Sequence, residues 1–590
     1  MAHGFIVLSR KIVTYIQNSF GGSHPVTAMA DSRTGAELFT DVLESYGVRY
    51  VFGNPGTTEL PVMEALSGSE LEYVLAPHED IAVGMAAGYA STKNYRADED
   101  GSPVGVVNLH VAPGVAHGLG NLYGASVTGA PLVVTAGAHS LDFRHEEPIL
   151  SGDVLAMTEQ FTKWSAEVTD VASVPTMLRR AFRVAQTPPT GPVFLSLPLD
   201  VMMAETDADP ERLGRIQNPG AGDPTAIARA AELLAEADDP VLVVGDHIPR
   251  HNAYSDADAL DAAVRLAEAT GARVHAEILA CEVDFPGDHE QWVSHVPPDE
   301  DIAAATMNSD TLVFAGCSTN TTLTRHDRDL VPDDATLIDL NDEPWQVGKN
   351  TPADVAVTGD LGLVMDELAE AVELSDDELA GRLERVRQFK EFAGQQMASM
   401  GEGSGDDPRA SKAELVDTLR ETLSSPYIVD EGITSKYVML LRWPFERESY
   451  ISNKGGGLGY GLPAAVGAAM AEAETDDPRQ VVGFVGDGSY LYYPHTLYSA
   501  ARYDVDLTVV VPDNRNYRIL KDNTLKLFGG EDDDHEYVGM DFEPPVDIPT
   551  NAESHGASGY LVESPEDIAE TLETALAEDG PSVVDVLVHD

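Results

Sequence analysis

Short apolar runs recur along the chain from about residue 32, and longer helix-like segments separate them. The runs at 48–52, 105–109, 132–136 and 193–197 are five residues long and rich in apolar side chains. A strand buried on both faces of a parallel sheet shows such a continuous run, and a helix supplies the crossover to the next strand. This alternation predicts a doubly wound α/β domain.

The same alternation continues in a second and a third stretch of the chain. Residues 201–224 are rich in Asp, Pro and Gly, which is typical of a linker. A helix-like segment at 226–237 follows it, and a charged, partly helical segment at 375–410 comes later. The strands expected in the second stretch are 241–244, 274–276, 312–315 and 336–340.

These patterns predict an α/β fold with three doubly wound parallel-sheet domains in series. The domains are expected at 31–205, 220–374 and 411–590, with a connector at 375–410. Residues 1–30 are predicted to be a disordered extension or the product of an upstream start codon. Their apolar run precedes the basic residues, whereas a signal peptide has the reverse order. A short membrane-surface helix is the alternative for this segment.

The charge balance narrows the possible partners. The chain has 99 acidic and 37 basic residues, a net charge of −62. Such a surface repels nucleic-acid phosphates and anionic membranes, so neither is an expected partner. The acids are spread through ordinary apolar patterning, which argues against acidic disorder and favours a cytoplasmic protein of a high-salt organism. The two cysteines, Cys281 and Cys317, provide no disulfide framework and are expected to be packed thiols.

Candidate chemistry appears first where two predicted strands end. The run 481–485 leads directly into Gly-Asp-Gly, and the run 507–511 leads into residues 513–516. Neighbouring parallel strands lie about 4.8 Å apart, so Asp487 and Asn514 are expected to face one point. Hard oxygen ligands suit Mg²⁺ or Ca²⁺ bound to phosphate oxygens. Gly-Asp-Gly alone is also a common turn, which is the plain alternative.

This combination resembles the cofactor motif of thiamine-diphosphate enzymes, in which Gly-Asp-Gly precedes Asn-Asn by some two dozen residues. The first Asn of that motif is Asp513 here, a departure, but the metal-ligating position falls on Asn514. The resemblance implies that the backbone carbonyl of Asn516 is a further metal ligand. It also implies that the diphosphate lies on Gly486, Asp487, Gly488 and Ser489.

Glu79 opens a segment dense in Gly and Ala, and a similar segment occurs at 462–471. A glutamate in the first turn of a helix is usually only a favourable dipole partner. The run from Glu79 to Ala90, however, resembles the segment that carries the essential glutamate of the family. That glutamate bonds a ring nitrogen of the aminopyrimidine and so promotes removal of the thiazolium C2 proton.

A glycine-rich stretch at 455–461 is the next candidate. A dinucleotide fingerprint is not expected, because Tyr460 interrupts the glycines and residues 451–454 do not suggest a strand. By resemblance, Gly456 holds the pyrimidine and Leu458 wedges under the cofactor. Thr434 and Ser435 follow a predicted strand at 427–429 and are assigned to the diphosphate, with a shift of one residue left open. The three domains are thus pyrimidine-binding, central and diphosphate-binding.

Within the family, the chain is most similar to benzoylformate decarboxylases. The segment 52–61 resembles their first loop, with Thr57 at the position of a pocket serine. His110 and His289 match their two active-site histidines, which would transfer protons near the substrate carboxylate. Ile519 and Asn523 depart from the residues that shape the phenyl pocket, so the substrate stays open.

The resemblance implies non-oxidative decarboxylation of a 2-oxo acid through a ylide and an enamine. Acetolactate synthase is similar in layout, so carboligation of 2-oxo acids is an alternative, although nothing in the sequence suggests a flavin. A cofactor-binding paralogue without catalysis is the other alternative. The family builds each active site from two subunits, which implies a homodimer at least and favours a homotetramer.

Overall fold

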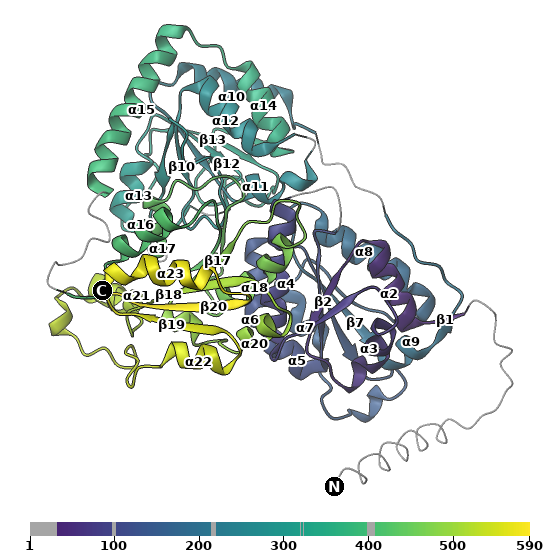
Figure 1. The fold of residues 1–590 in the computed structure, drawn as a ribbon. Helices are drawn as coiled ribbons and strands as arrows, with labels where there is room; N and C mark the ends of the chain where they lie inside the picture. Colours follow the sequence, from purple (N-terminus) through teal and green to yellow (C-terminus); the bar gives the residue numbers. More distant parts are fainter. Residues whose placement is uncertain are drawn as a thin grey trace, which may run out of the picture.

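The computed structural model describes residues 32–96, 102–213, 220–255, 257–318, 320–322, 324–397 and 407–589. Three α/β domains follow one another along the chain and meet near the middle of the molecule (Figure 1). In the described part of the chain, each domain has one sheet of six strands, and all neighbours within these sheets are parallel. The predicted fold class is therefore confirmed.

The first sheet carries buried apolar strands at its centre, as the sequence predicts. Thr34 caps the first long helix and forms a capping box with Glu37. A short antiparallel pair, β1 (Arg33–Thr34) and β8 (Glu205–Thr206), closes the domain. The strand order is β3 (Glu72–Leu75), β2 (Tyr50–Gly53), β4 (Gly105–Leu109), β5 (Leu132–Ala138), β7 (Val193–Pro198), β6 (Ser165–Glu167). The helices of this domain are α2 (Gly35–Ser45), α3 (Leu60–Leu66), α4 (Glu79–Tyr95), α5 (Val111–His117), α6 (Leu119–Thr128), α7 (Val154–Thr158), α8 (Val174–Gln186) and α9 (Leu199–Met203).

The second sheet has the same design and its own apolar core. The long helix that follows it, α15 (Asp376–Met397), occupies most of the predicted connector. The strand order is β11 (Trp292–His295), β10 (Arg273–Ala276), β9 (Pro240–Val244), β12 (Thr311–Ala315), β13 (Thr336–Asn341), β14 (Val355–Thr358). The helices of this domain are α10 (Pro224–Glu236), α11 (His247–Arg250), α12 (Ala259–Thr270), α13 (Glu300–Thr306) and α14 (Leu361–Ala371).

The third sheet contains the strands that end at the predicted metal site. Its strand order is β16 (Tyr450–Ser452), β15 (Tyr427–Glu431), β17 (Val481–Val485), β18 (Leu507–Asp513), β20 (Pro581–Leu587), β19 (Ser558–Val562). The helices are α16 (Lys412–Thr422), α17 (Lys436–Arg442), α18 (Gly461–Glu472), α19 (Asp487–Tyr490), α20 (Thr496–Arg502), α21 (Arg518–Phe528), α22 (Ile548–Ser554) and α23 (Ile568–Leu576).

One detail differs from the sequence predictions. Residues 450–452 form the edge strand β16, so a strand does precede the glycine-rich stretch. Only three residues pair there, which left too short an apolar run to recognise. The predicted extension at 1–30 lies outside the described residues.

Cys281 and Cys317 are buried free thiols, as expected. Among the described residues, no helix combines the length and apolar character that crossing a bilayer requires.

The two helices dense in Gly and Ala, α4 and α18, pack against each other where the first and third domains meet (Figure 1). A Cβ at Gly467 would lie 1.9 Å from the carbonyl oxygen of Met85, and one at Gly88 would lie 2.2 Å from that of Ala464. Both helices are buried on every side. Glycine is therefore required at this contact because the two backbones touch.

Replacement of Gly467 by Ala is expected to lower the free energy of unfolding by about 1–3 kcal/mol or more, since rigid backbone must move. Calorimetric melting of the purified protein would show the loss as a lower Tm. The matched control is Gly381→Ala in α15, where a Cβ would meet nothing within 4 Å. That change should hold or raise the Tm, because Ala favours a helix over Gly by up to about 1 kcal/mol. An equal Tm for both variants would contradict the close contact.

A buried lysine ties the third domain to the central one. Lys454 lies in the loop after β16, and its side chain is only 5% exposed. Its ammonium group donates hydrogen bonds to Asp246 at 2.7 Å and to Glu277 at 2.6 Å, both in the central domain. A charge at this depth is stable only when it is paired, so the loop that begins at Lys454 has a fixed anchor.

Candidate active site

Two neighbouring strands of the third sheet end at the same edge and present an acid and an amide. Asp487 is the first residue of α19 and lies two residues beyond the end of β17, and Asn514 directly follows β18. The two strands are hydrogen-bonded neighbours in parallel orientation. Asp487 is 6% exposed and Asn514 is 9% exposed, so both lie beneath the surface. The βαβ geometry expected from the sequence is present at this edge.

The electrostatics of this edge favour a cation. Gly488 donates its backbone N–H to Asp487 Oδ1 at 2.8 Å, while Asp487 Oδ2 is buried and accepts no hydrogen bond within the described residues. Burial and the adjacent Asp513 carboxylate raise the pKa of Asp487 to about 8. The same two causes raise the pKa of Asp585, on the neighbouring strand β20, to about 8. Carboxylate oxygens that lack partners here fit a divalent cation.

The turn after β18 is held by its own side chains. Arg515 donates its N–H to Asp513 Oδ1 at 2.8 Å and has a positive φ of 60°, which costs strain in a non-glycine residue. Asn516 donates its backbone N–H to Asn514 Oδ1 at 3.3 Å and its side-chain amide to Asn514 O at 2.8 Å. The turn therefore keeps Asn514 and Asn516 against each other at the sheet edge.

A buried glutamate, Glu431, organises the start of α18. It ends strand β15, is 3% exposed, and accepts backbone N–H groups from three successive residues, 459–461, at 2.8–3.2 Å. Its carbonyl accepts the N–H of Gly486 at 3.3 Å. Burial raises the pKa of Glu431 to about 7, although the three N–H groups oppose that shift. Glu431 thus joins the glycine-rich loop to the turn that carries Asp487.

The remaining residues predicted to hold the cofactor lie around Glu431. Gly456 has a φ of 68°, and a Cβ there would meet nothing within 4 Å, so this backbone faces open space. Leu458 is half-buried in the same loop. Thr434 and Ser435 lie between β15 and α17, and Ser435 is 2% exposed. Gly486, Gly488 and Ser489 form the turn at Asp487.

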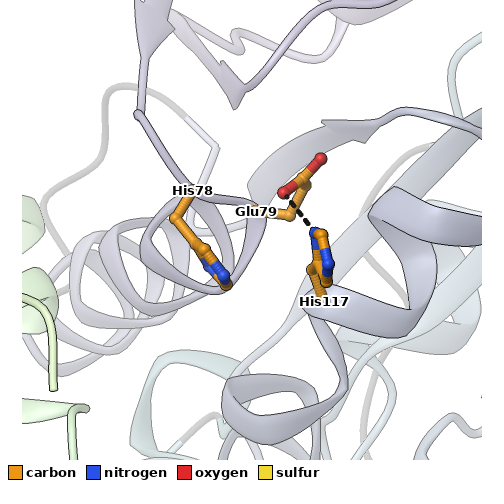
Figure 2. A group of neighbouring side chains, drawn as sticks. All are labelled: His78, Glu79 and His117. Carbon is orange, nitrogen blue, oxygen red and sulfur yellow. Dashed lines mark hydrogen bonds and ion pairs between the residues drawn. The ribbon is translucent and has the colours of Figure 1, made fainter.

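Glu79 is the first residue of α4, and its side chain lies against α5 of the same domain. His78 precedes it and its Nδ1 accepts the N–H of Asp80 at 3.1 Å. His117, the last residue of α5, lies 3.2 Å from Glu79 Oε2 through its Nδ1, as Figure 2 shows. The Glu79 side chain is 10% exposed. Glu79 is therefore a nearly buried carboxylate with one oxygen already engaged by an imidazole.

His110 sits between β4 and α5 and is paired with a buried acid. Its Nδ1 lies 2.7 Å from Glu59 Oε2, and the Glu59 side chain is fully buried. Glu59 also accepts hydrogen bonds from Thr58 Oγ1 at 2.7 Å and from the N–H of Gly56 at 3.1 Å. A Cβ at Gly56 would overlap the His110 ring, so glycine leaves room for the imidazole. Thr57 is exposed and begins the short 3-10 helix Thr57–Glu59, which ends at Glu59.

A cavity of about 390 Å³ opens beside the first residues of α5. It lies at the carboxyl ends of β4, β5 and β7, where open α/β sheets bind ligands. Val111, which follows His110 and has a positive φ of 35°, lines it together with Ala112. Arg144, which pairs with Glu167 at 2.6 Å, and Asp153 are charged groups of its lining. The volume suits a small organic molecule.

His289 lies in the central domain and contacts only groups of that domain and of α15 in the described structure. Its ring meets the buried Phe285 edge-on at 5.2 Å, and its Nε2 lies 3.6 Å from Glu268 of α12. Lys390 of α15 donates to its carbonyl oxygen at 3.1 Å. Within one chain, the structure does not bring His289 together with His110 or Glu79.

Three family models match the chain in the order of its domains. They are the N-terminal TPP binding domain at residues 33–162, the central domain at 227–368, and the C-terminal TPP binding domain at 430–586 of thiamine pyrophosphate enzymes. Together they cover well over half of the chain. The chain belongs to the thiamine pyrophosphate enzyme family. The sequence resemblance to this family is thereby confirmed.

Similar thiamine pyrophosphate enzymes include members with different activities. Benzoylformate decarboxylase of Pseudomonas aeruginosa is 30% identical, covering 92% of this chain and 97% of the relative. A probable acetolactate synthase large subunit of Methanocaldococcus jannaschii is 27% identical, covering 94% and 92%. Among solved structures, a thiamine diphosphate-dependent 4-hydroxybenzoylformate decarboxylase of Rhodococcus jostii has a TM-score of 0.79 at 27% identity, covering 94% of this chain and 99% of that chain.

The residues predicted to form the cofactor site fall into separate groups in this chain. Asp487, Asn514 and Asn516 share one sheet edge, and Glu431 links them to the loop with Gly456 and Leu458. Glu79 and His110 lie in the first domain at the two ends of α5. Sequence reasoning missed three residues of these groups, Glu59, Glu431 and His117. The only sequence signal for Glu59 and Glu431 is their position along the chain. Glu59 follows a predicted turn, and Glu431 follows a predicted strand.

Proposed function

We propose that the protein is a thiamine-diphosphate-dependent enzyme that decarboxylates a 2-oxo acid without oxidation and releases an aldehyde. The observation that carries this proposal is the His110–Glu59 pair, a histidine oriented by a buried carboxylate beside a cavity. The similarity to benzoylformate decarboxylase over almost the whole of both chains supports it.

Bound thiamine diphosphate would supply a thiazolium carbon that adds to a keto group and accepts the electron pair left when carbon dioxide departs. Asp487, Asn514 and the backbone carbonyl of Asn516 would hold Mg²⁺ or Ca²⁺ against its diphosphate. Gly456 offers the open backbone on which the pyrimidine would rest, with Leu458 beneath it. Glu431 keeps this loop and the Asp487 turn in a fixed relation.

The two nitrogens of the His110 imidazole differ in their contacts, because Nδ1 is hydrogen-bonded to Glu59 and Nε2 is the nitrogen left for substrate. Glu59 has its oxygens occupied by N–H and O–H donors as well as by His110, so it acts as an acceptor and His110 Nδ1 carries the proton. Nε2 is then the nitrogen that takes up or returns a proton beside the reacting carbons. Thr57 lies on the same short 3-10 helix and is exposed towards solvent, where it can contact substrate.

Product analysis tests the proposal directly. The holoenzyme is incubated separately with pyruvate and with benzoylformate, and the products are identified by NMR and chromatography. An aldehyde, with one carbon dioxide released per 2-oxo acid consumed, supports decarboxylation. Acetolactate or acetoin as the main product would instead favour carboligation, an activity to which the similarity with the acetolactate synthase subunit points. Cofactor binding without any product would favour a non-catalytic paralogue.

Binding of Mg²⁺ is expected to release a proton at neutral pH and to weaken as the pH falls below about 8. Burial and Asp513 raise the pKa of Asp487 to that value, so a proton competes with the cation for the same oxygens. Titration calorimetry at pH 7 in buffers of different ionisation enthalpy measures the proton count. Identical apparent enthalpies in all buffers would contradict this prediction.

We further propose that each complete site combines Glu79 of one subunit with Asp487 of another, in a homodimer or homotetramer. Within one chain, the described contacts of Glu79 all lie in the first domain, which supports this arrangement. A cofactor held by the third domain of a partner subunit would then reach Glu79 from outside. The mixing experiment in the Discussion tests this arrangement.

A further inference from the structure

The carboxylate of Glu79 has two oxygens in different surroundings. Oε2 lies 3.2 Å from Nδ1 of His117. Oε1 accepts no hydrogen bond within the described residues and lies over Gly114, where a Cβ would approach it to 3.0 Å. A side chain at position 114 would crowd Oε1, whereas glycine leaves it accessible. One oxygen is thus fixed by the protein and the other is left for a ligand.

The proton positions around this carboxylate follow from the contacts. A carboxylate oxygen accepts hydrogen bonds, so Nδ1 of His117 is the donor to Oε2. The neighbouring His78 has the opposite arrangement, because its Nδ1 accepts the N–H of Asp80. The rings of His78 and His117 stack at 5.2 Å, and Figure 2 shows them on either side of Glu79. The stack limits rotation of the His117 ring and keeps Nδ1 aimed at Oε2.

We propose that His117 is a positioning residue that holds Oε2 of Glu79, so that Oε1 is the oxygen presented to the aminopyrimidine of thiamine diphosphate. This inference rests on the proposed role of Glu79 in cofactor activation. His117 thereby sets the orientation in which the Glu79 carboxylate meets the cofactor.

Other polar groups near His117 and Glu79 have different hydrogen-bond partners or lie farther away. Asp80 accepts from Tyr493 at 2.9 Å and from the backbone of Asn121 at 2.7 Å, so it is turned away from Glu79. The ring of His495 lies 6.3 Å from that of His78 rather than beside His117. Among the described residues, His117 is the group that donates to the Glu79 side chain. In the part of the chain that the structure describes, no second donor contacts this carboxylate.

The side chain of His117 is 59% exposed, so its replacement should leave the Tm of the protein nearly unchanged. This makes three variants usable. His117→Ala removes the donor. His117→Asn places a neutral N–H close to the position of Nδ1, because both atoms are attached two bonds beyond Cβ. His117→Gln carries its N–H one bond farther and serves as the matched control for a displaced donor.

The experiment measures exchange of the cofactor C2 proton for deuterium in the holoenzyme, by acid quench and NMR, with no substrate present. Cofactor Kd is measured in parallel by tryptophan fluorescence. We expect His117→Ala and His117→Gln to slow exchange about tenfold, and His117→Asn to restore most of the rate. The cofactor Kd should change much less than the exchange rate, since the metal site is intact in all three.

Two results would overturn the proposal. One is wild-type exchange in His117→Ala. The other is equally slow exchange in His117→Ala and His117→Asn, which would mean that the ring acts through its stacking on His78 and not as a donor. Glu79→Gln provides the reference arm: if it leaves exchange unchanged, the proposed role of Glu79 fails, whatever the His117 variants show.

Discussion

Replacement of Glu79 by Gln is expected to lower turnover of a 2-oxo acid by about 10²–10⁴-fold while thiamine diphosphate still binds. Gln preserves the size of the side chain and can still accept the hydrogen bond from His117, so the fold and the cofactor pocket should persist. It cannot take up a proton, and that step is worth a factor in this range. Steady-state kinetics, with cofactor Kd measured alongside, would check the result.

The matched control is Glu37→Gln, the same chemical change in the first turn of α2 in the same domain. Glu37 belongs to a capping box, a role that Gln can also fill, so turnover should stay at the wild-type level. If Glu79→Gln turned over as fast as the wild type with cofactor bound, the cofactor-activating role of Glu79 would be excluded.

Replacement of Asp487 by Ala is expected to weaken binding of the divalent cation roughly 10²-fold or more, and binding of thiamine diphosphate with it. The variant loses a charged metal ligand, and even indirect contacts around metal sites are worth factors of about 10–100. Calorimetric titration with Mg²⁺ and cofactor would measure both losses. Asp339→Asn, a change at a buried acid of the central domain, should leave both affinities unchanged.

The conservative variant Asp487→Asn is expected to change the melting temperature of the metal-free protein in a defined direction. The pKa of Asp487 is raised to about 8 in the folded protein, against about 4 for an unfolded aspartate. The unfolded chain therefore holds fewer protons between these values, and the metal-free protein loses stability as the pH rises through that window. Asp487→Asn should melt higher than the wild type without metal at pH 7–8, and should lose the rise in Tm that Mg²⁺ gives the wild type.

Mixing the two inactive variants tests whether the site is shared between subunits. If Glu79 and Asp487 of different chains meet, a hybrid of Glu79→Gln and Asp487→Ala chains contains one intact and one doubly altered site. Random reassociation would then restore about a quarter of the wild-type sites. If both residues served a site within one chain, every site in the mixture would lack one of them, and activity would stay absent.

The central strands of each sheet could be predicted from the sequence because burial on both faces produces an unbroken apolar run. The strands β4 and β17 are fully buried along their length. The edge strands could not be predicted in this way, because one side of the strand meets solvent and the apolar run is short. All three residues of β6 are half-buried, and only one of the five residues of β19 is fully buried.

The same reasoning separates the site residues that the sequence reveals from those that it hides. Asp487 and Asn514 stand directly after recognisable neighbouring strands, so the topology alone brings them together. Glu431 and Glu59 act on partners 28 and 51 residues away along the chain. His117 reaches Glu79 across 38 residues. Only the packing of the segments determines such pairs, and no local spacing encodes them.

The backbone contact between α4 and α18 also bears on how the chain is made. The ribosome completes α4 several hundred residues before it reaches α18, a delay on the order of tens of seconds at about 5–20 residues per second. During that interval the face of α4 that will receive α18 has no partner. Because the face is built from glycine and alanine, it exposes backbone and methyl groups and few large apolar side chains. The first domain therefore exposes little aggregation-prone surface until the third domain has been synthesised.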